Sequence, residues 1–148
     1  MSELFAQTKK TVEATLQKLG LDPQKALVKS ADDQVSYTLM RGSAAVLVTV
    51  VHRKEQDAVF LRVASPVMNP ADGNREGLYK KLLELNAAGL ANAAFALLND
   101  RVVAVSERPA EDLDGGEVEQ IIRHLSAVAD TYDDRLVKEF GGKRASDK

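Results

Sequence analysis

Residues 44–52, with the sequence AAVLVTVVH, constrain the fold more than any other stretch of the chain. They are rich in β-branched and apolar side chains, which is typical of a strand. Side chains alternate between the two faces of a sheet, and here both sets are apolar. One set is Val46, Val48 and Val50, and the other is Ala45, Leu47 and Val51. Because an antiparallel strand with one solvated face would alternate apolar with polar residues, this strand predicts a sheet that is covered on both faces.

A second such stretch, residues 82–109, predicts the end of a helix, two strands and a proline stop. Asn99-Asp100 has the composition of a two-residue hairpin turn. With that turn, the expected strand pairs are Leu97–Val102, Phe95–Ala104 and Ala93–Ser106. Both faces of this hairpin are apolar, so we expect it to lie inside the sheet and not at an edge.

Hydrophobic periodicity and punctuating residues predict the remaining elements. A helix over residues 3–19 follows Ser2, which can cap it, and Gly20 ends it. The others are a possible short strand at 26–30, strands at 35–40 and 58–65, a helix at 75–88 (or from Asn69-Pro70), and a long helix at 117–140 with Asp114 as its cap. Pro66 ends the 58–65 strand. We therefore expect an α+β fold with an antiparallel five-stranded sheet, in the order α-β-β-β-α-β-β-α. It forms a single domain over residues 1–140, followed by a flexible polar tail at 141–148.

Composition excludes several classes of function. The 20 Lys and Arg nearly balance the 22 Asp and Glu, which argues against a nucleic-acid binder with a basic face. The chain has no cysteine, so thiolate chemistry, zinc ribbons and disulfides are excluded. No apolar run is long enough to span a bilayer, and the first residues do not form a secretory signal. We expect a cytoplasmic, soluble protein without a cofactor.

Residues that could support catalysis are few and scattered. His52 and His124 lack neighbours with metal-ligand spacing, and the adjacent Asp133-Asp134 pair points in two directions from a helix. The two glycines at 115–116 belong to no phosphate-binding motif. The sequence therefore predicts no enzyme. A weaker alternative is a site assembled from dispersed polar residues: His52, Tyr37 and Arg62.

The element order and two segments resemble a known family. These segments are residues 82–113, LLELNAAGLANAAFALLNDRVVAVSERPAEDL, and the helix EVEQIIRHLSAVADTYDDRL at 117–136. The chain resembles the bacterial YbjN-like proteins, which are related to type III secretion chaperones of the CesT type. This resemblance implies a secretion-chaperone-like fold, a homodimer, and a polypeptide partner bound on apolar surface. It implies no catalytic residues.

The hypothesis is thus a non-enzymatic protein-binding module, chaperone-like or a regulatory adaptor, without a nucleic-acid or membrane partner. The expected partner-binding residues are Val46, Val48 and Val50. The expected dimer-interface residues are Leu78, Tyr79 and Leu82. The alternative is a small-ligand-binding regulatory protein with a pocket between the sheet and the C-terminal helix. Helices on both faces of the sheet would remove the need for a partner.

Overall fold

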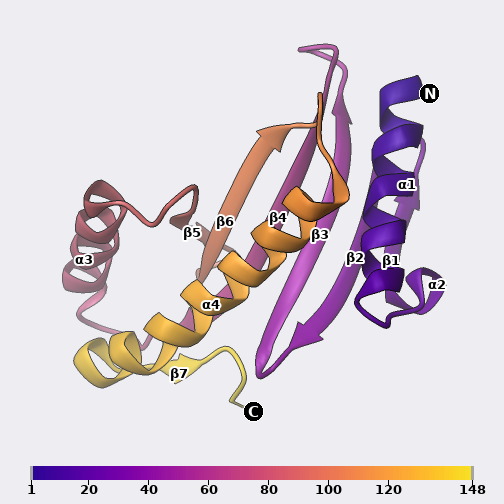
Figure 1. Cartoon of the computed structure of the whole chain (residues 1–148). Helices are drawn as coiled ribbons and strands as arrows, with labels where there is room; N and C mark the ends of the chain where they lie inside the picture. The colour runs from indigo at the N-terminus through magenta and orange to yellow at the C-terminus, as the bar shows by residue number, and fades with distance from the viewer. Residues whose placement is uncertain (1, 148) are drawn as a thin grey trace.

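An antiparallel sheet carries the fold in the computed structural model, which describes residues 2–147 (Figure 1). The helices are α1 Glu3–Lys18, α2 Pro23–Ala26, α3 Arg75–Ala88 and α4 Gly115–Phe140. The strands are β1 Leu27–Ala31, β2 Gln34–Arg41, β3 Ala44–Arg53, β4 Ala58–Asn69, β5 Ala94–Leu98, β6 Arg101–Pro109 and β7 Lys143–Arg144. The caps expected from the sequence are present: Ser2 Oγ accepts from Phe5 N–H, and Asp114 forms a capping box with Glu117.

The sheet has seven strands, so the expectation of five is corrected. Its order is β1-β2-β3-β4-β6-β5, and β7 pairs with the far end of β4. The short, polar β1 gives little periodic signal, and β7 has only two residues. β7 lies within the predicted tail at 141–148, yet it pairs with Met68 and Asn69, and Ala145 N–H donates to Val67 O at 3.0 Å. These backbone hydrogen bonds connect the segment to the last residues of β4, a central strand of the sheet.

Strand β4 passes through Pro66 instead of ending there, which corrects the predicted boundary. Pairing with β3 stops at Leu47–Ala64, two residues before the proline. Pairing with β6 continues, with a register shift between Pro66 and Met68. Proline lacks an N–H, so it fits a strand where one neighbour has ended and a bulge interrupts the ladder. β7 occupies the edge of β4 that β3 has left.

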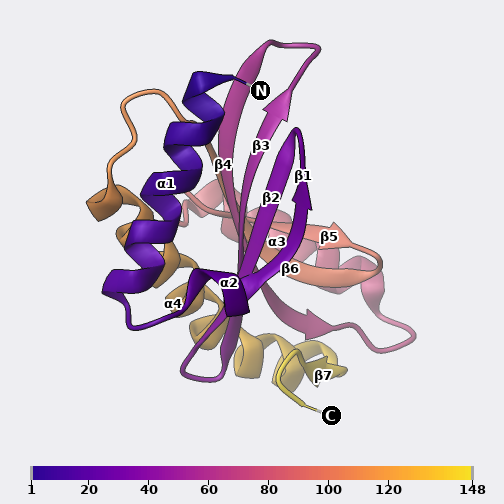
Figure 2. The same cartoon turned by 90° about the vertical axis from the view of Figure 1, so that its right-hand side faces the viewer.

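Helices α1 and α4 lie on the same side of the sheet (Figure 2). Phe5, Val12 and Leu16 of α1 are at most 2% exposed, and Ile122 and Leu125 of α4 are fully buried. These side chains join the inward residues of the central strands in one core. The salt bridge between Lys18 and Glu119, at 3.5 Å, links the two helices at their surface.

The hairpin of β5 and β6 forms as the sequence predicts, except that the two strands pair over fewer residues than expected. Asn99 and Asp100 both have positive φ, 51° and 63°, as a two-residue turn requires. Leu97 pairs with Val102 and Phe95 with Ala104, but β5 begins at Ala94, so the expected Ala93–Ser106 pair is absent. The expectation that the hairpin lies inside the sheet is wrong for β5, which is an edge strand, whereas β6 lies inside.

Candidate protein-binding surfaces

The three valines expected to bind a partner lie in the core. Val46, Val48 and Val50 are 0% exposed and sit on the face of β3 that α1 and α4 cover. Register places Val48 between Tyr37 and Val63, in the middle of this covered face. The predicted surface is therefore assigned to the wrong face of the strand. Periodicity alone identifies two apolar faces but does not tell which one the helices cover.

The opposite face of the sheet, which we call the open face, carries the other set of side chains. Figure 2 shows no helix lying across it. Two neighbouring rows of side chains on this face are small and apolar. The strand pairing gives the first row as Leu47, Ala64, Val105 and Ala94. The second row is Pro66, Val103 and Ala96, and Ala45 lies beside it. At its margins, Met40 is 62% and Leu98 is 54% exposed. The rows are partly exposed, with Leu47 at 37%, and form an apolar surface of the kind that marks interaction sites.

A band of polar residues crosses the open face next to these apolar rows. Ser36 and Thr49 share a hydrogen bond of 2.9 Å. Glu107 lies between two arginines, hydrogen-bonded to Arg53 and 3.6 Å from Arg62. The bond from Arg53 is the main reason that the pKa of Glu107 lies below its usual range. The band limits the apolar surface to one half of the open face.

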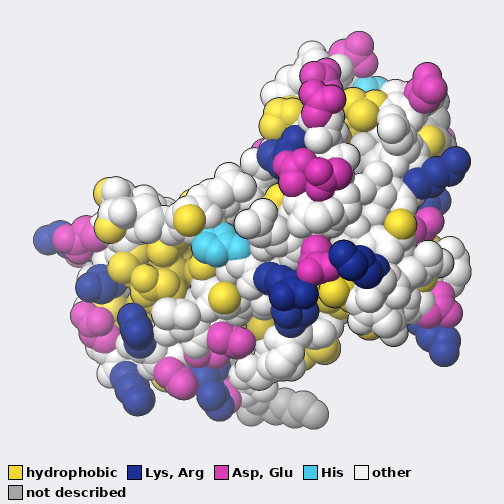
Figure 3. All heavy atoms as spheres, viewed as in Figure 1, with side chains coloured by type: hydrophobic (Ala, Val, Ile, Leu, Met, Phe, Trp, Pro, Cys, Tyr) yellow, Lys and Arg dark blue, Asp and Glu magenta, His cyan; other side chains and the backbone are white. Residues whose placement is uncertain are grey.

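Helix α3 presents a second apolar surface. Of the predicted dimer residues, Leu78 and Leu82 face the molecule's own core, at 2% and 5% exposure, and Tyr79 is half-buried. Leu83, four residues after Tyr79, is 68% exposed. Figure 3 shows hydrophobic side chains gathered over the part of the molecule that holds α3. The outer face of α3 is therefore formed by Tyr79, Leu83 and Ala87, with charged residues beside them.

Asn86, near the end of α3, closes part of the β5 edge, a role that the sequence reasoning missed. Its side-chain amide donates to Phe95 O at 3.2 Å, and its side-chain oxygen accepts from Phe95 N–H at 2.8 Å. The carboxamide thus takes the place of a neighbouring strand. Edge strands are usually protected from pairing with other chains, and Asn86 protects β5 at this residue.

The polar residues considered for a catalytic site are not brought together. Tyr37 is fully buried under the helices, and its hydroxyl donates to Glu13 Oε2 at 2.6 Å. Arg62 lies on the open face, and His52 lies 3.2 Å from the exposed Asp57 in the β3–β4 hairpin. Within residues 2–147, no group of three or more His, Cys, Asp or Glu side chains is placed to hold a metal ion.

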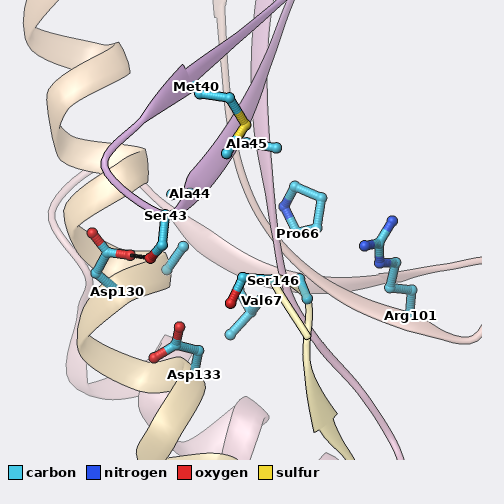
Figure 4. Close-up of a pocket in the computed structure, with 12 residues that line it drawn as sticks. Met40, Ser43, Ala44, Ala45, Pro66, Val67, Arg101, Asp130, Asp133 and Ser146 are labelled. Atoms are coloured by element: carbon cyan, nitrogen blue, oxygen red, sulfur yellow. Dashed lines mark hydrogen bonds between the residues drawn. The ribbon is translucent and has the colours of Figure 1, made fainter. Parts of the chain in front are cut away.

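The interface between the sheet and α4, where a small-ligand pocket is the alternative hypothesis, is filled by core side chains. A cleft of about 250 Å³ remains at one end of it (Figure 4). Its walls are Met40, Ala45 and Pro66 from strands and Asp130 and Asp133 from α4. Ser43 Oγ donates to Asp130 at 3.2 Å. Burial is the main cause that raises the pKa of Asp133. Arg101 also lines the cleft, which is therefore of mixed charge, and the cleft is smaller than most ligand pockets.

The fold and its surfaces define a protein-binding module: helices cover one face of a sheet, and apolar side chains occupy the other. The chain belongs to the family described as T3SS (YopN, CesT) and YbjN peptide-binding chaperone 1, TY-Chap1, whose sequence model matches residues 6–148. This confirms the resemblance to YbjN-like proteins and type III secretion chaperones. The protein is a member of a peptide-binding chaperone family, and no curated protein matches its sequence.

Three solved structures share this fold at low sequence identity. The ExsC–ExsE complex matches with a TM-score of 0.67 at 15% identity, covering 91% of this chain and 97% of that one. The HopA1–SchA chaperone–effector complex gives 0.59 at 16%, covering 88% and 94%. The ExoU–SpcU heterodimeric complex from the type III secretion system of Pseudomonas aeruginosa gives 0.57 at 17%, covering 87% and 97%. The α+β class and antiparallel sheet are confirmed. In the described part of the chain, no helix is long and apolar enough to cross a membrane.

Proposed function

We propose that this protein is a non-enzymatic chaperone or adaptor that binds an extended segment of a partner polypeptide on its open face. The observation that carries the proposal is the pair of apolar rows around Leu47 and Val105, which no helix within residues 2–147 covers. Family membership supports a peptide as the occupant, and the similar HopA1–SchA structure is described as a chaperone–effector complex. Small side chains such as Ala64 and Ala96 leave room for the side chains of a bound peptide.

We further propose that two copies pair through the outer face of α3. Tyr79, Leu83 and Ala87 form an apolar stripe at four-residue spacing. Glu76, Lys80 and Glu84 run beside it with alternating charge. A two-fold axis would place each stripe against itself and bring lysine of one copy near glutamate of the other. Burying Leu83 would contribute about 1–2 kcal/mol per copy.

Two charge substitutions test these surfaces separately. Leu47→Glu places a carboxylate on the open face, and Leu83→Glu places one on α3. We expect Leu47→Glu to abolish binding of peptides selected on the wild-type chain and to leave the dimer intact. Leu83→Glu is expected to give a monomer by light scattering that still binds peptide. Unchanged peptide affinity in Leu47→Glu would refute the open-face site, and a wild-type monomer at micromolar concentration would refute the dimer.

The small-ligand alternative has less support, because core side chains fill the middle of the sheet–α4 interface and the cleft beside Asp133 holds only about 250 Å³. A larger cleft, beside Ser106, lies at the edge of β6. The cytoplasmic location, the single-domain boundary and the absence of nucleic-acid and membrane partners stay predictions from the sequence.

A further inference from the structure

Strand β6 extends past the end of β5, so its last residues have a neighbouring strand on one side only. β5 pairs with β6 up to the Ala94–Val105 pair. Residues 106–109 pair with β4, and no strand within the described residues 2–147 lies on their other side. Figure 1 shows this longer part of β6 reaching beyond β5. Among residues 2–147, no backbone hydrogen bond connects it to the 89–93 loop.

The backbone groups that face this unpaired edge can be assigned by alternation. Both backbone groups of Phe95 bond to Asn86, so they point away from β6, and its partner Ala104 points toward β4. In an antiparallel ladder the direction alternates at every residue. The N–H and C=O of Glu107 therefore face the unpaired edge. The carbonyl of Pro109 accepts from Arg108 Nε at 2.9 Å.

A cleft of about 510 Å³ lies beside this edge, between the 89–93 loop and the first half of α4. The molecular surface is hollowed between the part that holds α3 and the far end of the sheet (Figure 3). Ile121 and Leu125 give the cleft an apolar wall. His124 holds the loop in place, because its ring Nε2–H donates to Leu90 O at 2.5 Å.

Ser106 is the buried polar residue of this cleft, which Asn92, Gln120 and His124 also line. Ser106 is 5% exposed, and its Oγ has no hydrogen-bond partner among the described residues. A buried hydroxyl without a partner costs free energy, and such groups are rare in folded proteins. Ser65 is a matched contrast: it is 0% exposed, and its Oγ donates to Ala45 O at 2.7 Å. Ser106 thus offers a donor and an acceptor that the chain itself does not use.

We propose that a partner polypeptide adds a short extended segment to the β6 edge, pairing with Glu107 and inserting one side chain between Ser106 and Ile121. The inference rests on the proposed peptide-binding function and adds a second contact site to the open face. An extended backbone is the occupant that matches an N–H and a C=O on one strand edge. The inserted side chain has a polar end on an apolar stem, as in threonine, asparagine or glutamine. Its surroundings are the Ser106 hydroxyl, the apolar walls, and the polar side chains of Asn92 and Gln120, which also line the cleft.

The test uses peptides of about a dozen residues, selected from a random phage-displayed library on the full-length chain. In the free protein, the Glu107 amide should exchange with deuterium much faster than those of Ser106 and Arg108. Saturating peptide should slow exchange at Glu107 by at least about tenfold. Ser106→Ala should weaken affinity about three- to tenfold, the usual range for one hydrogen bond, without lowering the melting temperature of the free protein. Ser65→Ala should lower that temperature and leave the affinity unchanged.

The outcomes separate this site from the proposed function. One outcome is that Leu47→Glu weakens peptide affinity, while peptide does not slow exchange of the Glu107 amide and Ser106→Ala does not change the affinity. This outcome would overturn the edge site and leave the open-face site supported. In the absence of peptide, exchange of the Glu107 amide could become slower as the protein concentration rises. That result would assign the edge to a second copy of the chain and overturn the proposal. A library that yields no binder to the wild-type chain would overturn both.

Discussion

Replacing Tyr37 by phenylalanine removes the hydroxyl that joins the sheet to α1. The ring is fully buried, and its O–H donates to Glu13 Oε2 at 2.6 Å. Hydrogen bonds to charged groups contribute about 1.5–3 kcal/mol. Because Glu13 is only half-buried, water can replace the lost donor, so we expect a loss of about 1.5 kcal/mol in the free energy of unfolding. Urea denaturation of Tyr37→Phe, Glu13→Gln and the double variant would isolate the coupling between the two residues.

The same pair predicts a dependence on alkaline pH. Burial, followed by the bond to Glu13, raises the pKa of Tyr37 above its usual value. The unfolded chain releases the phenolic proton near pH 10, whereas the folded chain retains it. Stability from this group is therefore complete below pH 10 and declines as the pH rises. Between pH 10 and pH 11, the wild type should lose about 1 kcal/mol more than Tyr37→Phe.

Lysines and the other tyrosines titrate in both proteins, so their contributions to the pH dependence of stability cancel in the comparison with Tyr37→Phe. A constant stability difference between pH 9 and pH 11 would refute the assigned pKa direction. Equal stability of Tyr37→Phe and the wild type at neutral pH would refute the contribution of the bond to Glu13.

Three other substitutions test features of the same fold. Asn86→Ala removes both bonds to Phe95, and urea denaturation should show a loss of about 2 kcal/mol. Asp133→Asn should raise the melting temperature at pH 7, because burial disfavours the carboxylate. This gain in stability should shrink as the pH falls and the carboxyl group of the wild type becomes protonated. Thermal denaturation of both proteins at pH 7 and pH 4 would measure it. Asp114→Ala removes the cap of α4 and should cost about 1 kcal/mol, measured by urea denaturation; no change would contradict the capping box.

Local sequence signals predict most elements of this fold. Ser2 and Asp114 begin their helices as expected, and the positive φ angles at Asn99 and Asp100 match the predicted hairpin turn. Of the two starts that the sequence allows for α3, the structure has Arg75 and not Asn69-Pro70, and the helix ends at Ala88 as its periodicity predicts. These features depend on contacts between residues close in sequence, so the sequence shows them directly.

The choice of surface depends on contacts between distant residues, so the sequence leaves it open. Val48 and Leu47 are adjacent and both apolar, yet α1 and α4 cover only the face that holds Val48. Ser36 and Thr49 are a partial signal, since they place polar atoms in the other face and pair across two strands. The unpartnered hydroxyl of Ser106 and the clamp of Asn86 on Phe95 become visible only when register and burial are known.

The clamp of Asn86 links α3, one helical turn from its exposed Leu83, to the edge of β5. Leu83 is exposed on α3, and three residues later Asn86 carries the carboxamide that satisfies Phe95. A ligand that docks on α3 without moving it leaves the β5 edge closed, whereas one that rotates the helix frees the backbone of Phe95 for a new strand. Linkage is reciprocal, so a strand bound at Phe95 changes affinity at Leu83 by the same factor. Asn86 is thus the side chain through which a movement of α3 would reach the β5 edge.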